Sequence, residues 1–438
     1  MSIYSAFYAS LSGLSSNANA LGVIGNNLAN LNTVGFKSST ASFQDLFNAA
    51  IANQGTQGNG DPMQVGLGAS LGSVAEDFSQ GSFQQTGSVT DMALQGNGFF
   101  TVANKAGSAL YTRDGNFTID KSGYLVDSSG DHVQGWNATN GTISTNGLPG
   151  AIQVNLAGTS GGAPTANMEV IANLDSTSAA AFTSTVQIYD SLGATHSVNI
   201  TFPPAAATVG PPPMSNWSIA AAVTDGGTVT AGLPASVSFD QSGNFAGWTD
   251  SAAAFHSVST PATYTNPSLT ISGWSNGAAP NATTWLLTSP AGTGAALTKY
   301  LSSYASTSTT SATSQDGFGA GTVSSLTVDQ NGTIIGNFTN GQTIPMAQVA
   351  ISTFLNEGGL SKQGGNNWIA TVSSGSAAVG AANTGGRGSI LGSNLELSNV
   401  DVATELTAMI INQNGYQANS RVVTTANNLL QEVLNLIH

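Results

Sequence analysis

Few residues of this chain could do chemistry, and their spacing is not that of an active site. The four histidines have no metal-ligand spacing, and the absence of cysteine excludes thiolate sites and thiol nucleophiles. No Gly-x-Ser-x-Gly turn or phosphate-binding loop occurs, although residues 66–72 and 96–98 are rich in glycine. Acidic residues are scattered without a pattern that marks an acid and a base. We therefore expect no catalytic residue, no cofactor, no metal ion and no small-molecule substrate.

The polar side chains that stand out are amides. Asn26, Asn27, Asn30 and Asn32 follow one another closely and lead into Gly35-Phe36-Lys37. Each amide can donate and accept hydrogen bonds, either to its own backbone or to another chain. Two interpretations stay open: a helix end whose polar groups are satisfied locally, and a contact between copies of the chain.

A helix must carry these amides. In the N-terminal stretch, apolar residues recur every seven positions and a companion row runs between them. Glycines in this stretch each cost up to about 1 kcal/mol relative to Ala in a helix interior. A helix of roughly 30 residues that ends near Asn30 is predicted, and it needs neighbours for its stability. The rows are Phe7, Leu14, Leu21 and Leu28, and Ile3, Ile24 and Leu31.

The C-terminal stretch has the same seven-residue spacing. Its companion row is polar, with Asn399, Gln413, Ser420 and Asn427, and Gly415 interrupts the pattern. An ordinary dry two-stranded coiled coil is therefore not encoded, and we predict that this seam packs against something larger. The apolar row is Leu395, Val402, Met409, Tyr416, Val423, Leu430 and Ile437, with Leu406 beside it.

Composition and charge exclude several classes of function. The chain has 438 residues, enough for roughly three domains, but only 7% of them are charged and the net charge is −14. This sign argues against nucleic acid as a partner. The N-terminus lacks the basic and apolar regions of a Sec signal, and no apolar run could span a membrane.

Between the two predicted helices the sequence has the texture of β structure. Short β-prone runs occur at 98–102, 115–119, 124–126 and 132–136, and again at 325–328, 333–335, 348–352 and 368–372. Asp-x-x-Gly segments at 120, 127, 240 and 329 are predicted to be hairpin turns rather than calcium loops. The stretch between these two β blocks is rich in Ala, Ser, Thr, Gly and Pro, and predicts an inserted all-β domain.

The stretch Asn26-Asn27-Leu28-Ala29-Asn30 followed by Gly35-Phe36-Lys37 closely resembles the N-terminal signature of bacterial flagellar axial proteins, the rod, hook and hook-associated family. Residues 94–100, 111–117, 325–332, 380–389 and 398–419 resemble further segments of that family. The resemblance covers about 1–155 and 320–438. About 160 residues fill the slot where hook-type members carry an outer β domain, so a hook-type subunit is predicted.

The resemblance implies a mainly β, nested multi-domain protein with α-helical terminal segments, in which the helices form a coiled-coil-like core and two β domains radiate outward. The expected parts are 1–74 with 393–438, 75–157 with 318–392, and the insert 158–317. The implied function is a bendable tubular homopolymer that transmits torque, with the helix rows as packing surfaces between subunits. Rod, hook-cap and hook–filament junction proteins and the flagellar type III export apparatus are the implied partners, on the flagellum outside the cell.

Other functions stay open at this point. A distal rod or other axial protein would share the terminal signatures. A secreted β-rich adhesin or surface-layer subunit would explain the composition and the lack of cysteine, but not the paired terminal heptads. A glycan-active enzyme would need a carboxylate pair that the sequence does not mark.

Overall fold

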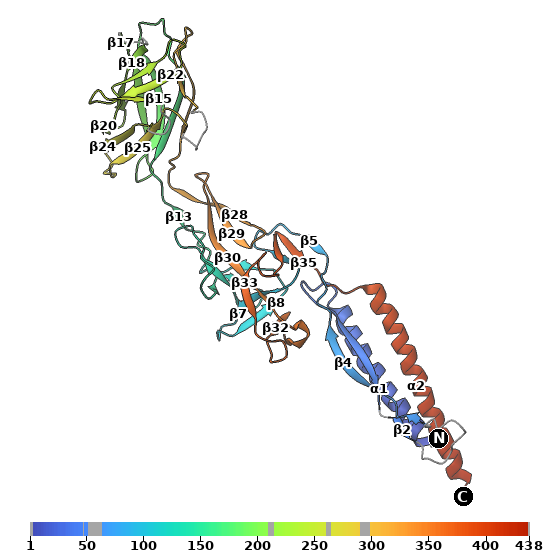
Figure 1. Ribbon diagram of the computed structural model, residues 1–438. Coiled ribbons are helices and arrows are strands. Elements are labelled where there is room, and N and C mark those ends of the chain that lie inside the picture. Colours follow the sequence, from blue (N-terminus) through green and yellow to red (C-terminus); the bar gives the residue numbers. More distant parts are fainter. Residues whose placement is uncertain are drawn as a thin grey trace. The chain divides into compact units, whose positions relative to one another are not determined.

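The computed structural model describes residues 3–46, 48–50, 64–208, 214–259, 264–289 and 298–436. Strands dominate these residues and a long helix lies towards each end of the chain (Figure 1), so the predicted mainly β fold with helical ends is confirmed. The chain divides into two compact units. The first unit comprises Met1–Leu156, Ser325–Asn337 and Thr343–His438, and the inserted unit comprises Ala157–Ser324 and Phe338–Gln342.

Helix α1 (Ile3–Ala29) and helix α2 (Val402–Leu436) belong to the first unit. The predicted end of the N-terminal helix near Asn30 agrees with the structure. The C-terminal helix begins later than the heptads suggest, because Asp401 acts as its N-cap. Its Oδ1 accepts the backbone N–H of Thr404 at 2.7 Å, and this hydrogen bond lowers the pKa of Asp401.

A two-stranded ribbon packs on α1. Strands β1 (Ser39–Asp45) and β4 (Ala69–Glu76) pair antiparallel, from Ser39 opposite Glu76 to Asp45 opposite Ala69. The hydroxyl of Ser16 on α1 donates to the carbonyl of Ala69 at 3.3 Å. The ribbon also continues into the short pair β2 (Asn48–Ala50) and β3 (Gln64–Gly66).

The main sheet of the first unit has the strand order β28-β29-β30-β11-β7-β8-β32-β31. Strand β30 is the longest strand of this sheet. Its residues 347–349 pair with β11, and Ile351 and Ser352 pair with β7. Its apolar core includes Phe100, Phe117, Val133 and Ile351, all fully buried. The strands are β28 (Gly321–Val328), β29 (Thr333–Phe338), β30 (Thr343–Thr353), β11 (His132–Asn137), β7 (Phe99–Ala103), β8 (Ala109–Thr112), β32 (Asn367–Ile369) and β31 (Ser361–Gly364).

Short strands complete this unit. They include β9 (Thr118–Ile119), β10 (Leu125–Val126), β12 (Gly150–Ala151) and β33 (Ala378–Ala381). Two further pairs carry the chain back towards the helices: β34 (Ser389–Gly392) with β6 (Met92–Gln95), and β35 (Asn394–Glu396) with β5 (Phe83–Gln85). The predicted Asp-x-x-Gly turns are hairpin turns, in which the Asp Oδ1 accepts the N–H groups two and four residues on.

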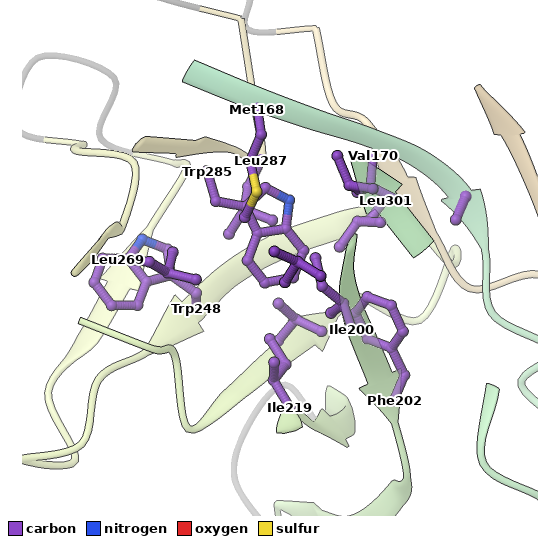
Figure 2. Close-up of a cluster of buried hydrophobic side chains, with 14 of the residues drawn as sticks. Met168, Val170, Ile200, Phe202, Ile219, Trp248, Leu269, Trp285, Leu287 and Leu301 are labelled. Atoms are coloured by element: carbon purple, nitrogen blue, oxygen red, sulfur yellow. The ribbon is translucent and has the colours of Figure 1, made fainter. Parts of the chain in front are cut away.

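The inserted unit has its own core, in which Trp285, Phe202 and Ile200 are fully buried beside Met168 and Leu301 (Figure 2). Its sheets have the orders β20-β24-β25-β14-β26 with β27 on β14, β15-β16-β19, and β17-β18-β21-β22-β23. The strands are β13 (Thr159–Ser160), β14 (Asn167–Asn173), β15 (Phe182–Tyr189), β16 (Thr195–Phe202), β17 (Pro204–Thr208), β18 (Met214–Ser218), β19 (Ala220–Val223), β20 (Thr228–Ala231), β21 (Ser236–Phe239), β22 (Phe245–Thr249), β23 (Phe255–Ser257), β24 (Ser268–Ser272), β25 (Asn281–Leu286), β26 (Leu301–Ser302) and β27 (Thr309–Gln315).

Candidate polymerisation site

Helices α1 and α2 lie side by side and run antiparallel, and their contact uses small and amide side chains. The amide of Asn17 lies against Gly415, where an added Cβ would stand 3.1 Å from the amide. The amide of Asn419 lies against Gly13, where an added Cβ would stand 2.7 Å away. Each helix therefore supplies one glycine notch and one asparagine that fills the notch of the other. This reciprocal fit fixes the register of the pair.

The same contact ends in an apolar depression towards the N-terminus of α1. Its volume is about 300 Å³ and it is open to solvent. It is lined by Ala6, Arg421, Val422, Thr425, Ala426 and Leu429.

The apolar rows predicted from the heptads are mostly half-buried or exposed in the single chain. On α1, Ile24 is buried, while Phe7, Leu14, Leu21 and Leu28 are half-buried. On α2, Met409, Val423 and Leu430 are half-buried, and Val402, Leu406 and Tyr416 are exposed. Two neighbours that the heptad row does not include, Ile410 and Ile411, are 58% and 64% exposed. Helix α2 thus exposes several large apolar side chains to solvent.

Three residues of the predicted rows are not found in the described helices. Leu395 is not helical: it lies in strand β35, buried and paired with Gln84, because α2 begins only after Asp401. Leu31 lies in the turn that follows α1 and is half-buried there. Ile437 lies outside the described residues. The prediction of a helical packing role for Leu395 is therefore wrong.

The asparagines of the predicted motif have different environments. Asn27 is buried; its amide exchanges two hydrogen bonds with the backbone of Ser39 and donates to Glu405 Oε1 of α2 at 2.8 Å. Asn26 is exposed, and the Asn30 amide donates to its carbonyl. The local interpretation, a satisfied helix end, therefore describes Asn27 and Asn30. Asn26 and the exposed Asn32 keep an accessible surface.

Gly35, Phe36 and Lys37 form the exit from α1. Gly35 has φ of 67°, and a Cβ on it would stand 2.6 Å from the backbone nitrogen of Asp114, so only glycine fits this turn. Its N–H donates to the carbonyl of Glu396 at 2.8 Å. Phe36 is buried under Lys362, whose ammonium lies 5.2 Å from the ring centroid.

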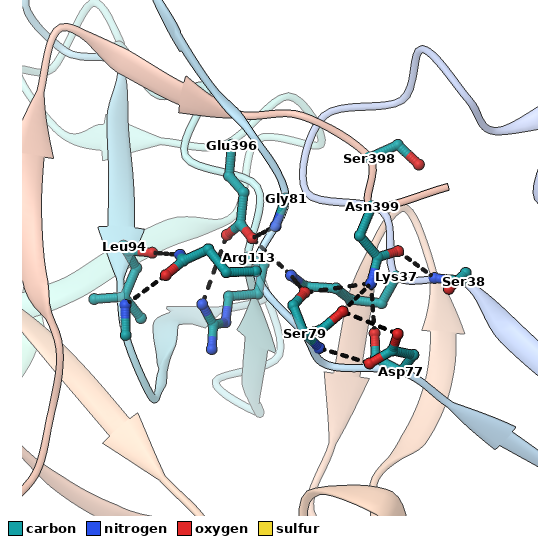
Figure 3. Close-up of polar contacts among 12 residues, drawn as sticks. Lys37, Ser38, Asp77, Ser79, Gly81, Leu94, Arg113, Glu396, Ser398 and Asn399 are labelled. Carbon is teal, nitrogen blue, oxygen red and sulfur yellow. Dashed lines mark hydrogen bonds and ion pairs between the residues drawn. The ribbon is translucent and has the colours of Figure 1, made fainter. Parts of the chain in front are cut away.

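Lys37 lies in a buried ion cluster at the base of the helix pair (Figure 3). Its Nζ lies 2.6 Å from Glu396 Oε1 and donates to the Ser79 carbonyl at 2.7 Å, while Arg113 Nη1 lies 3.6 Å from Glu396 Oε2. Burial lowers the pKa of both Lys37 and Arg113, and the Glu396 carboxylate opposes this shift in each case. One buried carboxylate thus holds two buried cations, which come from segments far apart in the sequence.

Two further contacts fasten the same region. Asn399 Oδ1 accepts the backbone N–H of Ser38 at 2.8 Å, and its Nδ2 donates to the carbonyl of Asp77 at 2.8 Å (Figure 3). At the end of β4, Glu76 binds Lys362 Nζ at 2.8 Å and accepts the Trp368 indole N–H at 2.8 Å. The helices and the ribbon are therefore tied to the β sheet by charged and amide groups.

Sequence reasoning did not single out Arg113, Glu396 or Asn399 as members of one site. Asn399 was visible only as a polar break in a heptad row. The rarity of charge was a usable signal. Because the chain has only 8 Lys and Arg residues, Lys37 in the Gly35-Phe36-Lys37 motif would be expected to pair with a carboxylate if it is buried.

Within the described ranges, no group of three or more His, Cys, Asp or Glu side chains could hold a metal ion. In the same part of the chain, no helix contains a segment that is both long and apolar enough to cross a membrane.

Comparisons with known proteins bear on the whole chain. Four family models match successive segments: "Flagella basal body rod protein" at 7–37, "Flagellar hook protein FlgE/F/G D1 domain" at 93–162, "Flagellar basal body protein FlaE D2 domain" at 155–318, and "Flagellar basal body rod FlgEFG protein C-terminal" at 392–436.

Full-length relatives agree with these matches. The chain is 32% identical to the flagellar hook protein FlgE of Escherichia coli over 452 residues, which cover 98% of this chain and 100% of that protein. It is 31% identical to FlgE of Treponema pallidum and 30% identical to FlgE of Borreliella burgdorferi, with 98% of each chain covered in both cases.

Proposed function

Because this chain belongs to the flagellar hook protein family, we propose that its helix pair is the surface through which copies assemble into a tube. The chain is a structural subunit of the flagellar hook, a part of the bacterial flagellum. The observation that carries the proposal is the distribution of side chains on the pair. Glycine and asparagine meet between the helices, and several large apolar side chains of α2 are exposed in the single chain.

This distribution is the reverse of that in a helix pair that is stable alone. Backbone ordering costs about 1 to 2 kcal/mol per residue, and a contact of glycine and amide groups buries little apolar surface to offset it. Leu406, Ile410, Ile411 and Tyr416 would become buried once other copies surround the pair. Assembly would then complete the folding of the helices.

In the assembled tube, the helices form the inner wall and the β regions extend outward. The chain would work as three parts, 1–74 with 393–438, 75–157 with 318–392, and 158–317. Its neighbours are other copies, and at the ends of the polymer the rod, hook-cap and hook–filament junction proteins. Frayed terminal helices in the free subunit suit passage through the flagellar type III export apparatus without a cleaved Sec signal.

The polymer also bends, and so acts as a universal joint that passes torque from the rod to the filament. In the inserted unit, the described residues form only two ion pairs. Each pair joins a histidine and an aspartate within a single hairpin, and the two pairs lie in different hairpins. Neutral Ser, Thr and Asn surfaces exchange partners through water with little net change in free energy, whereas strong ion pairs resist exchange. Charged pairs introduced on the lateral faces of this unit should stiffen the polymer.

The experiment that tests the main proposal compares two double variants of the full chain. I410S/I411S removes two exposed aliphatic side chains of α2, and Q413S/N414S changes two exposed polar ones on the same helix. Both variants should stay folded and soluble as monomers. Tubes should form with the wild type and Q413S/N414S, but not with I410S/I411S, as seen by electron microscopy and sedimentation.

A second arm removes residues 1–30 and 400–438 together. The remaining chain keeps Lys37, Arg113 and Glu396 and should be a folded monomer that never polymerises. Tubes built by this shortened chain, or by I410S/I411S at wild-type concentrations, would overturn the proposal.

A further inference from the structure

Charge is almost absent from the two long helices. Helix α1 has no charged residue, and α2 has only Glu405, Arg421 and Glu432. Glu405 is used within its own chain, because its Oε1 accepts the Asn27 amide at 2.8 Å. Arg421 and Glu432 are exposed, and neither forms an ion pair with any described residue. One free cation and one free anion thus remain on the described part of the helix pair.

Arg421 and Glu432 lie on one side of α2. They are eleven positions apart, which is close to three turns of a helix with about 3.6 residues per turn. Their separation along the helix axis is therefore about 16 Å. The two side chains of one copy cannot come within the roughly 4 Å of an ion pair at that distance. Any pairing between these two positions must join two copies of the chain.

Apolar surface lies beside these charges. The depression of about 300 Å³ on the helix pair is lined by Arg421 itself, by Val422 and Leu429 of α2 and by Ala6 of α1. Val422 and Leu429 are 44% and 46% exposed. An apolar hollow of this kind is typical of a surface that a partner covers, and not of one that faces water. The free charges therefore border a part of the helix pair that is suited to contact.

Covering this surface creates a demand for a counter-ion. In the proposed tube, other copies surround the helix pair and remove water from it. The arginine side chain keeps its charge, and a charge that loses water without gaining a partner carries a large desolvation penalty. No described residue of the same chain pairs with Arg421, and Glu432 is the free carboxylate of the described helices.

We propose that Arg421 of one copy forms an ion pair with Glu432 of a neighbouring copy in the polymer. This inference rests on the proposed function, because it requires the tube. Copies in an open helical polymer share one polarity, so the two α2 helices run parallel and are shifted by about three turns. Each copy then presents Arg421 to one neighbour and Glu432 to another. Antiparallel helices would instead form two such ion pairs and close into a dimer, which does not continue into a tube.

The ion pair would fix the axial register of neighbouring copies. The apolar rows repeat every seven residues, so apolar contacts alone are compatible with a slip of one repeat. Such a slip would leave Arg421 and Glu432 among neutral groups, because charge is so rare on the helices. A single pair of opposite charges can select one register in this way, as charged positions do in coiled coils.

Charge reversal in the full chain tests the pair. R421E leaves two acidic side chains on this side of α2, and E432R leaves two basic ones. Each variant alone should raise the critical concentration for tube formation at least tenfold in sedimentation assays, while circular dichroism of the monomer stays that of wild type. K105E and D225R make the same changes of net charge at exposed positions outside the helices, and should change the critical concentration by less than about twofold.

Mixing the two variants gives the sharpest readout. In contacts between unlike chains, the two introduced charges face each other, and so do the two native charges. An equimolar mixture of R421E and E432R should therefore form tubes under conditions in which neither variant does so alone. The double variant R421E/E432R should also polymerise, with a critical concentration within about threefold of wild type.

The outcomes separate the two proposals. A wild-type chain that forms no tubes overturns the proposed function. Wild-type tubes together with unchanged critical concentrations of R421E and E432R would show that both side chains stay in water, and would overturn the present inference alone. The inference is also wrong if both single variants fail and neither the mixture nor the double variant recovers, because the two charges then act separately.

Discussion

Glu396 is the residue on which the base of the helix pair depends. Its carboxylate is fully buried and, among the described residues, is the one that forms ion pairs with Lys37 and Arg113, both of which are also buried. The same carboxylate accepts the N–H of Gly81 at 2.9 Å. A buried charge that loses its partner keeps its full desolvation cost, so this site tolerates changes poorly.

We expect Glu396→Gln to lower the free energy of unfolding of the first unit by about 3 to 5 kcal/mol, because two buried cations lose their counter-ion. Urea denaturation of the monomeric full chain measures the change. Asp45→Asn, which removes an exposed carboxylate, is the matched control and should shift the free energy by less than about 0.5 kcal/mol. A change in Glu396→Gln no larger than in this control would contradict the assigned role.

A second residue-scale feature recurs in the inserted unit. Asp190 and Asp250 each begin a hairpin turn, and each binds the histidine six residues later, His196 at 3.0 Å and His256 at 3.4 Å. Burial alone would raise the pKa of Asp190, but hydrogen bonds from Asn276, from His196 and from two backbone N–H groups lower it to about 2. The two hairpins differ in exposure: Asp190 is fully buried and Asp250 is 32% exposed.

These pairs predict how acid affects the inserted unit. A carboxylate whose pKa is lowered in the folded state stabilises it above the unfolded pKa of about 3.9, and this contribution is lost as the pH falls towards 2. Asp190 should contribute about 2 kcal/mol at neutral pH. In thermal melts between pH 5 and 2, Asp190→Asn should be less stable at pH 5 and should show a weaker pH dependence than wild type.

Asp250→Asn is the control for that series. Its carboxylate is partly exposed, so water screens its contacts and the substitution should change stability less than Asp190→Asn does. Equal effects of the two substitutions at pH 5 would show that the hairpin turn, and not the buried pair, determines acid sensitivity.

At the scale of elements, the fit of α1 to α2 depends on glycine. Gly13 receives the Asn419 amide, whereas an added Cβ on Gly22 would meet nothing within 4 Å. Replacing a helical glycine by alanine stabilises a helix by up to about 1 kcal/mol when nothing obstructs the methyl group. The two glycines therefore separate helix propensity from packing.

We expect Gly22→Ala to stabilise α1 by up to about 1 kcal/mol and Gly13→Ala to give little or no gain, because Asn419 must move. Hydrogen exchange of the α1 amides in the monomer measures both effects. If Gly13→Ala protected α1 as strongly as Gly22→Ala, the reciprocal fit would not control the register.

The heptad rows predicted the presence of both helices but not how the helices meet. Rows of Leu, Ile and Val are the usual sign of a helix interface, and the polar companion row predicted that these rows pack against something larger than a two-stranded coiled coil. Gly13, Asn17, Gly415 and Asn419 lie between the two helices of one chain, and nothing in a single sequence distinguishes a residue that faces its own chain from one that faces another. Leu395 fitted the heptad but belongs to a strand, because periodicity does not report a cap such as Asp401.

The strands were easier to predict than the ion cluster. The predicted runs 132–136 and 348–352 fall in β11 and β30, because β-prone residues and turn residues are local signals. Glu396, by contrast, meets Lys37 across 359 positions of sequence. Such a contact depends on the complete topology of the first unit.

At the scale of the whole molecule, the ion pairs of the described residues of the first unit lie where its parts join. Three of the 8 Lys and Arg residues, namely Lys37, Arg113 and Lys362, lie where the helices and the ribbon meet the sheet of the first unit. Ion pairs thus join these parts of the subunit to one another. In the proposed polymer, contacts between copies would instead use mainly apolar and amide groups.

The inserted unit should fold without the rest of the chain. Its core is continuous from Met168 to Leu301, and its entry and exit segments pair directly, with Thr159 opposite Thr322 and Ser160 opposite Gly321. Residues 157–324 expressed alone should give a dispersed NMR spectrum and one cooperative thermal transition. A molten or aggregated product would mean that this core needs the first unit.

The pairing of Thr159 with Thr322 has a practical consequence for engineering. The roughly 160 residues between them leave and re-enter the same ladder at neighbouring positions, so a tight reverse turn or a foreign cargo with adjacent ends could replace them. Fluorescent reporters or enzymes grafted at this point would decorate each protomer along a filamentous scaffold, without altering the residues that nucleate it.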